Sequence, residues 1–200
     1  YKHTGIFPEQ LENWKWSAEV IKKAKSKSKD AIKVLNLFGY TGGASLACVS
    51  AGAEVTHVDA SKVAVSWARE NAKLSGLGDA PIRYIVEDCM QFLKREIKRG
   101  NKYDGIIMDP PAFGHGPSGE LWKIEEDFLN LFELCKQVLS DKPLFIIING
   151  YASGYSSIAY YNNLTEIFKS LGGSVEIGEL ALMDKNSRPL PAGIFARWQK

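Results

Sequence analysis

The chain has 200 residues, of which 45% are hydrophobic and 24% charged, and its formal net charge is +2. These values are typical of one globular domain, and the small net charge allows a nucleic-acid partner without arguing for one. No apolar run approaches the ~18 residues of a membrane span and no signal peptide opens the sequence, so we expect no membrane partner. Because the sequence starts at Tyr1 rather than Met, we expect it to be a piece of a longer protein.

The three cysteines, Cys48, Cys89 and Cys135, are widely spaced. An odd number without a CxxC pair argues against a disulfide framework and against a structural zinc site. We therefore expect no bound metal and a reducing, cytoplasmic location. The sequence leaves the oligomeric state open.

Short apolar runs alternate with amphipathic stretches along most of the chain. The runs predict strands at residues 33–38, 54–59, 82–87, 105–109 and 143–149. Several are almost entirely apolar, as expected of parallel strands that are covered on both faces. The stretches between them predict helices at residues 44–50, 62–75, 90–99 and 120–139. This alternation predicts an α/β fold with a Rossmann-like, doubly wound, mostly parallel sheet.

The two ends of the chain differ from its middle. Residues 1–30 predict an N-terminal cap segment, irregular and aromatic at first and then helical, ahead of a ligand-binding domain at residues 31–200. Residues 174–182 and 194–199 predict an antiparallel C-terminal strand pair. Residues 183–192 between them contain Asn and Pro and predict a loop.

A sheet of this kind binds ligands beyond the carboxyl ends of its strands, so the residues there are the functional candidates. NLFGYTGGASLA follows the first strand, and its Gly39, Gly42 and Gly43 allow close approach of the backbone at the start of a helix. The second strand ends at Asp59, where a carboxylate can accept hydrogen bonds from both ribose hydroxyls. Alternatively, Asp59 or Ser61 only caps the next helix.

The next two strand ends also carry acids. Asp88 could accept a hydrogen bond from an adenine amino group or, alternatively, cap the following helix. The fourth strand ends in Asp109-Pro110-Pro111, where capping is a poor explanation because prolines stand where a helix would begin. This rigid corner would fix a carboxylate and a carbonyl pointing outward, with Phe113 as a flat apolar surface for a planar group such as a nucleobase.

Together the four strand ends describe a site for an adenosine with a reactive group between the glycines and the Asp109-Pro110-Pro111 corner. No lysine of a phosphate-binding loop follows the glycines, and their spacing is not the GxGxxG of nicotinamide dinucleotide binders. No Ser-His-Asp set stands at a nucleophile elbow. The ligand most consistent with adenine, ribose and no pyrophosphate cradle is S-adenosylmethionine.

The sequence resembles class I S-adenosylmethionine-dependent methyltransferases, and among them the ribosomal RNA large-subunit methyltransferase family. The resemblance rests on FGYTGG, VDAS and DPPAF, which match that family's FxYTGG, VDxS and DPPxF in the same order. It covers most of the chain. TGIFPEQ is similar to a segment that folds over the methionine part of the cofactor, and LPAGIFARW is similar to the last strand of the family.

The resemblance implies a cofactor site next to a target pocket. It implies that the cofactor is bound by Phe7, Gln10, Phe38, Gly39, Tyr40, Thr41, Gly42, Asp59, Ala60, Ser61, Asp88 and Cys89. It implies that the target pocket contains Asp109, Pro110 and Phe113. Two departures stand out: Asn36 replaces an acid that the family usually has, and Leu11 stands where the family tends to have an arginine.

A third departure concerns the mechanism. Family members that methylate cytosine C5 use a cysteine just after the fifth strand, but here that stretch reads IIINGYASGYSS without a thiol. Covalent chemistry is therefore disfavoured, and direct methyl transfer remains. Tyr151 and Tyr155 in this stretch either flank the target pocket or are surface tyrosines.

We therefore expect a methyltransferase that uses S-adenosylmethionine and acts on a base of RNA, with ribosomal RNA as the expected partner. RNA-modifying members of the family carry an RNA-binding module that this sequence lacks. Methyl transfer to a small molecule or to a protein side chain is therefore the alternative. A catalytically silent S-adenosylmethionine-binding domain is a third possibility, and the intact DPP corner counts against it.

Overall fold

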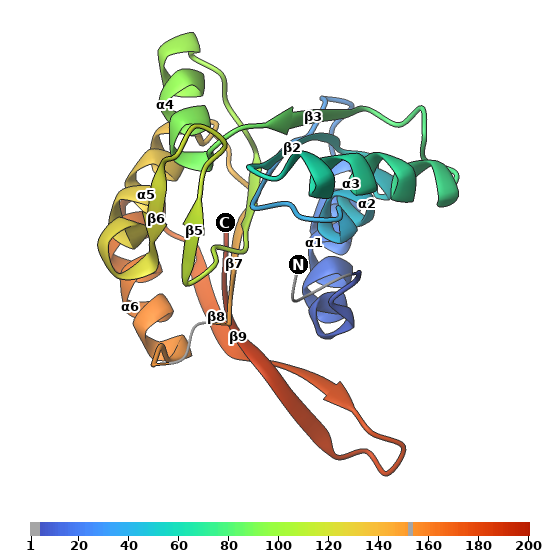
Figure 1. Cartoon of the computed structure of the whole chain (residues 1–200), viewed down its shortest axis with the longest axis vertical. Coiled ribbons are helices and arrows are strands. Elements are labelled where there is room, and N and C mark those ends of the chain that lie inside the picture. Colours follow the sequence, from blue (N-terminus) through green and yellow to red (C-terminus); the bar gives the residue numbers. More distant parts are fainter. Residues whose placement is uncertain (1–4, 152–153) are drawn as a thin grey trace.

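The computed structural model describes residues 5–151 and 154–200. The first four residues of the expected cap, and Ser153 in the stretch after the fifth expected strand, lie outside the described residues. A seven-stranded sheet forms the centre of the molecule, in the order β3-β2-β1-β4-β7-β9-β8 (Figure 1). Its strands are β1 (Lys33–Leu37), β2 (Glu54–Asp59), β3 (Ile82–Val86), β4 (Gly105–Met108), β7 (Phe145–Gly150), β8 (Ser174–Met183) and β9 (Pro189–Gln199).

The pairing of the strands confirms the predicted fold class. The neighbouring strands β3, β2, β1, β4 and β7 are all parallel to one another. The strand β9 runs antiparallel to both β7 and β8. The chain winds outward from β1 through β2 to β3 and then returns to place β4 on the other side of β1. Strand order therefore reverses between β1 and β4, and the carboxyl ends of these strands are the expected position of a ligand.

Helices cover both faces of the sheet. They are η1 (Pro8–Gln10), α1 (Leu11–Lys25), α2 (Gly43–Ser50), α3 (Lys62–Leu74), α4 (Cys89–Arg99), α5 (Ile124–Val138), α6 (Ser157–Phe168) and η2 (Lys169–Leu171). α1, α2 and α3 lie on one side of the sheet and α4, α5 and α6 on the other (Figure 1). In β4, Ile106 and Met108 belong to the core on the α5 side and Ile107 to the core on the α1 side, which explains why this strand is entirely apolar. No helix within the described residues is long and apolar enough to cross a membrane.

A short hairpin lies where the sequence predicted a loop and the first turn of a helix. β5 (Phe113–His115) pairs with β6 (Leu121–Lys123), and α5 therefore begins at Ile124 rather than at residue 120. The side chain of Trp122 is buried, and its indole N–H donates to the carbonyl of Pro111 at 2.6 Å. This anchor holds residues 121–123 extended against the proline corner, so the helix starts only after them.

The loop predicted at residues 183–192 is shorter in the structure. β8 continues to Met183 and β9 starts at Pro189, so only residues 184–188 form the turn. Asp184 closes that turn by accepting hydrogen bonds from the backbone N–H groups of Asn186 and Arg188. Beyond the end of β7 this part of β9 pairs only with β8, so its other edge is unpaired, and prolines are tolerated in such edge strands. The resulting arm projects from the body of the molecule (Figure 1).

The helix α6 was not assigned from the sequence. Ser156 caps it by accepting a hydrogen bond from the backbone N–H of Ala159. Tyr160, Leu164 and Phe168 are its buried residues, and they recur at four-residue steps. That spacing is the signal that could have found the helix.

Candidate active site

Residues that follow β1, β2, β3, β4 and β7 enclose a cavity of about 720 Å³. This volume lies within the ~300–1,000 Å³ of pockets for small molecules and cofactors. The cavity is lined by every predicted site residue except Phe113: Phe7, Gln10, Phe38, Gly39, Tyr40, Thr41, Gly42, Asp59, Ala60, Ser61, Asp88, Cys89, Asp109 and Pro110. The individual roles of these residues stay predictions.

The loop after β1 folds tightly at the start of α2. Gly42 adopts a φ of 93° directly before the helix, a conformation that favours glycine. Phe38 (φ 55°) and Tyr40 (φ 48°) also occupy the left-handed region, which is uncommon for residues other than glycine. Such backbone strain is frequent at ligand sites, because the surrounding structure must hold the loop in place.

Gly39 brings this loop into contact with β2. A Cβ atom at Gly39 would lie 2.5 Å from the imidazole ring of His57, closer than any side chain can approach. His57 is fully buried, its Nδ1 lies 3.0 Å from the hydroxyl of Ser45, and burial lowers its pKa to about 4. An uncharged histidine thus supports the floor of the loop, and only glycine fits above it.

Asp59 connects the ends of β1 and β2. Its carboxylate accepts hydrogen bonds from the backbone N–H of Tyr40 and from that of Ser61, both at 2.8 Å. Burial raises the pKa of Asp59, and these two hydrogen bonds oppose the effect. The cap of α3 is Ser61, whose hydroxyl accepts from the backbone N–H of Ala64. Asp59 itself therefore has no capping role, and its contact with a ribose stays a prediction.

Asp88 does cap a helix. Its Oδ1 accepts a hydrogen bond from the backbone N–H of Gln91 at 3.0 Å at the start of α4. The capping alternative is thus confirmed, while Asp88 also lines the cavity. The neighbouring Cys89 thiol accepts a hydrogen bond from the backbone N–H of Phe38 at 3.3 Å, and burial raises its pKa well above the usual value.

Asp109 stands at the end of β4 against the N-terminal segment. The Nε2 of Gln10 donates to its Oδ2 at 2.6 Å. Burial raises the pKa of Asp109 to about 6, the Gln10 hydrogen bond opposes this, and the carboxylate of Glu9 adds to it. A carboxyl group with such a pKa, in a cavity, is a typical functional-site candidate.

Phe113 is the predicted site residue that the structure does not bring to the cavity. It lies on β5 with 55% of its surface exposed, and its ring contacts that of His115. The pairing of β5 with β6 sets this orientation, and the sequence did not predict that hairpin. The aromatic rings of Phe38 and Trp122, whose centroids are 5.2 Å apart, line the cavity instead.

Two buried amides line the cavity without having been assigned a role. Asn149, at the end of β7, accepts a hydrogen bond at 2.8 Å from the side chain of Asn13, which in turn accepts one from Arg197. Asn36, in β1, donates to the hydroxyl of Ser45. A polar amide inside an otherwise apolar strand is the signal that could have identified Asn149.

The charges around the cavity are of one sign. Asp59, Asp88 and Asp109 line it, and no lysine or arginine is among its described lining residues. Such a lining favours a cationic ligand and disfavours a polyphosphate. Nor do the described residues contain a group of three or more His, Cys, Asp and Glu side chains that could hold a metal ion. A sulfonium cofactor with a ribose fits this site.

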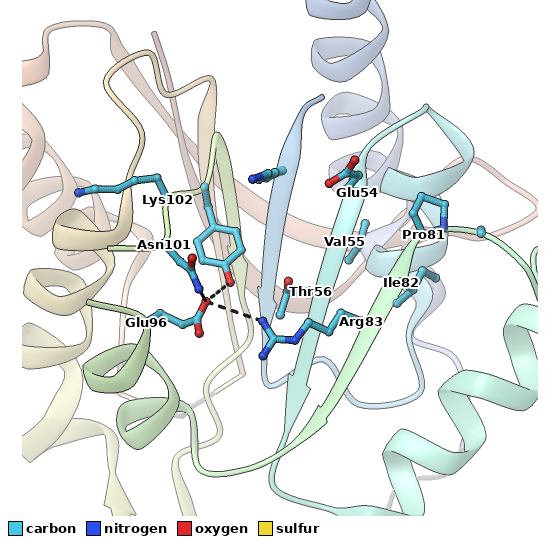
Figure 2. A pocket seen from close by; sticks show the side chains of 12 residues that line it. Glu54, Val55, Thr56, Pro81, Ile82, Arg83, Glu96, Asn101 and Lys102 are labelled. Atoms are coloured by element: carbon cyan, nitrogen blue, oxygen red, sulfur yellow. Dashed lines mark hydrogen bonds and ion pairs between the residues drawn. The ribbon is translucent and has the colours of Figure 1, made fainter. Parts of the chain in front are cut away.

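A second cavity, of about 460 Å³, lies at the opposite ends of the strands (Figure 2). The carboxylate of Glu96 is fully buried there and accepts hydrogen bonds from Tyr103 at 2.7 Å and Asn101 at 2.8 Å. Burial raises its pKa, but these hydrogen bonds and that of Arg99 outweigh the effect and hold the pKa below its usual range. Glu96 is thus engaged in fixing the end of α4, and this cavity is a feature of the scaffold.

The sequence of the chain matches a family model over this site. The model describes S-adenosylmethionine-dependent methyltransferases and matches residues 3–158. The chain therefore belongs to the S-adenosylmethionine-dependent methyltransferase family, and S-adenosylmethionine is its cofactor.

Curated relatives and a solved structure agree with this assignment. The ribosomal RNA large subunit methyltransferase K/L of Shewanella frigidimarina is 34% identical over 151 residues, which are 74% of this chain and 20% of that protein. The ribosomal RNA large subunit methyltransferase I of Aeromonas salmonicida is 38% identical over 111 residues, which are 55% of this chain and 26% of that protein. A crystal structure of an S-adenosylmethionine-dependent methyltransferase from Agrobacterium tumefaciens superposes with a TM-score of 0.93 at 41% identity, covering all of this chain and 64% of that one.

Proposed function

We propose that this chain transfers a methyl group directly to a base of RNA, with ribosomal RNA as its substrate and without a cysteine nucleophile. Relatives named as ribosomal RNA methyltransferases support the substrate, although the chain spans only about a fifth to a quarter of their length. We also infer a cytoplasmic location, which the three free cysteines support.

The observation that carries the proposal is the carboxyl group of Asp109, which lines the cofactor cavity at the end of β4. An exocyclic amine of a base would donate its hydrogen bonds to this carboxylate and to the carbonyl of Pro110. These acceptors would orient the lone pair of the nitrogen and stabilise the positive charge that develops during transfer. The rigid prolines support this role because they hold both acceptors in place.

The state of the thiols supports direct transfer. Cys48, Cys89 and Cys135 are all buried, and burial raises the pKa of each, to about 12 for Cys48. A thiol must ionise to attack a base. None of the three cysteines is therefore suited to form a covalent bond with the substrate.

The remaining chemistry is positioning. S-Adenosylmethionine, when bound, supplies an activated methyl group on a sulfonium sulfur. Asp109 and Pro110 would align the accepting nitrogen, and the aromatic walls formed by Phe38 and Trp122 would exclude water. Stacking of a flipped base on an aromatic ring contributes ~1–3 kcal/mol. The sequence predicts that Phe113 supplies this ring, and this stays a prediction. Phe113 could reach the base only if the β5–β6 hairpin moved.

The test is transfer of tritiated methyl groups to unmodified large-subunit ribosomal RNA, preceded by calorimetry with S-adenosylmethionine and NAD. We expect micromolar binding of S-adenosylmethionine alone, and label in RNA that is absent with Asp109→Asn. Label in protein or in small molecules, but not in RNA, would overturn the RNA substrate in favour of the alternative. Binding without any transfer would indicate a silent domain.

A further inference from the structure

A chain of hydrogen bonds connects the N-terminal segment to the proposed catalytic carboxylate. The Nε2 of Gln10 donates to the Oδ2 of Asp109 at 2.6 Å and to the hydroxyl oxygen of Tyr151 at 3.0 Å. Burial raises the pKa of Tyr151, and the nearby carboxylates of Asp109 and Glu9 raise it further, so the tyrosine stays protonated. The network thus runs from Tyr151 through Gln10 to Asp109.

This network leaves Gln10 a single orientation. Both hydrogens of its amide nitrogen are used, one by each acceptor. Turning the amide over would place its oxygen against an ionised carboxylate and lose the hydrogen bond to Asp109. Gln10 therefore distinguishes the two oxygens of Asp109, because it binds Oδ2.

The segment that carries Gln10 is seated on the walls of the cofactor cavity. The ring of Phe7 lies 5.7 Å from that of Tyr40 in the glycine loop and 5.7 Å from that of Tyr151. The hydroxyl of Thr41 donates to the carbonyl of Gly5 at 3.0 Å. The position of Gln10 thus depends on the same loop that encloses the cofactor site.

We propose that Gln10 is a positioning residue for methyl transfer: it holds Oδ2 of Asp109 in its charged form and leaves Oδ1 as the acceptor for the substrate amine. The proposal rests on the proposed function of Asp109. Tyr151 acts one step further away, by fixing the amide of Gln10. Neither residue needs to contact the methyl group.

The charge of Asp109 is the quantity that Gln10 controls. The titratable groups that face this carboxyl are Glu9 in η1, Tyr151 after β7 and Tyr160 in α6. None of them is a cation, so the amide of Gln10 is the principal group that favours ionisation. Its removal disfavours the charged form, and replacement by an acid disfavours it further.

The test compares Gln10→Ala, Gln10→Glu and Tyr151→Phe, with Gln137→Ala as the matched control. Gln137 is an exposed glutamine whose side chain donates to the carbonyl of Glu133 within its own helix. The first readout is the chemical shift of the Asp109 carboxyl carbon, measured by NMR as a function of pH. This measurement needs neither cofactor nor RNA. The second is the pH profile of methyl transfer.

We expect the midpoint of the Asp109 titration to rise by about one pH unit in Gln10→Ala, more in Gln10→Glu and less in Tyr151→Phe. The acidic limb of the transfer rate should move in the same order, with kcat near neutral pH about tenfold lower in Gln10→Glu. Gln10→Glu keeps the side chain's shape, so it remains informative if Gln10→Ala folds poorly.

Equal titration midpoints in the wild type and Gln10→Glu would overturn the inference. A merely structural role of Gln10 would not order the variants by charge. If the wild type binds cofactor but methylates no RNA, the proposed function fails, whereas the carboxyl titration still decides whether Gln10 controls the charge of Asp109.

Discussion

At the scale of single residues, Asp109 illustrates how a functional group is held at a cost in stability. Burial raises its pKa from 3.8 to about 6, so the folded protein binds this proton more tightly than the unfolded chain does. The stabilising effect of that proton is fully present below pH 3.8 and is lost as the pH rises through about 6. Above that pH the buried negative charge of Asp109 lowers the free energy of unfolding.

Asp109→Asn is therefore expected to stabilise the protein while it removes activity. Above neutral pH the free energy of unfolding should rise by about 2 kcal/mol, with little change in acid. Methyl transfer should fall at least ~100-fold, because the amide cannot stabilise the developing charge. Urea unfolding at two pH values and a transfer assay measure both effects.

The control for this prediction is Asp79→Asn, because Asp79 is exposed on the surface. It should change neither stability nor transfer. A less stable Asp109→Asn variant at alkaline pH would contradict the assignment of a buried, unfavourable charge.

Gly39→Ala should destabilise the fold by about 1–3 kcal/mol, because the new Cβ overlaps the ring of buried His57. Thermal unfolding measures the change. Gly114→Ala is the matched control, since its Cβ would meet only Pro111 at an ordinary 3.5 Å. Equal melting temperatures for the two variants would show that the loop after β1 can move away from β2.

At the scale of elements, the β5–β6 hairpin decides which side chains line the cavity next to the proline corner. Trp122 fastens it to the proline corner through the carbonyl of Pro111 and packs its ring against Phe38. The helix α5 starts directly after it, and Asp127 in the first turn accepts a hydrogen bond from the backbone N–H of Lys123. The hairpin thus connects the corner to the start of α5.

Trp122→Phe should loosen this hairpin. The variant loses the hydrogen bond to Pro111 and part of the buried ring, so we expect a loss of about 1–2 kcal/mol in stability. Methyl transfer should fall by a larger factor than cofactor affinity, because the corner that presents Asp109 is no longer held. Calorimetry and transfer kinetics separate the two effects, and an equal loss in both would contradict this role.

At the scale of the whole molecule, the fold collects its acids at one edge of the sheet. Asp59, Asp88 and Asp109 come from three different strands and meet around one cavity because parallel strands end at the same edge. The net charge of the chain, +2, gives no indication of this local negative field. Charge distribution rather than total charge therefore sets the preference for a ligand.

We expect the cavity to bind S-adenosylmethionine more tightly than S-adenosylhomocysteine, whose sulfur is uncharged, by roughly three- to tenfold. The difference should narrow as salt is added, because screening weakens the attraction. Calorimetric titrations at low and high salt measure the ratio. A preference for the uncharged product at low salt would contradict the electrostatic argument.

The sequence by itself determined the strands of the parallel sheet and most of the residues that line the cavity. A strand covered on both faces, such as β4, must be apolar, and the acids that end such strands have no place in the core. Local pattern was therefore sufficient to identify Asp59, Asp88 and Asp109, and resemblance added Phe7 and Gln10.

Only the tertiary structure decided how these residues meet. Gln10 and Asp109 are 99 positions apart, and their hydrogen bond depends on how the N-terminal segment packs over the cavity. The prolines of β9 join a strand because β8 offers a partner there, and Phe113 turns away because of a hairpin that Trp122 anchors. Periodicity and turn residues record which side chains are buried locally, whereas contacts between distant segments arise only when those buried faces pack together.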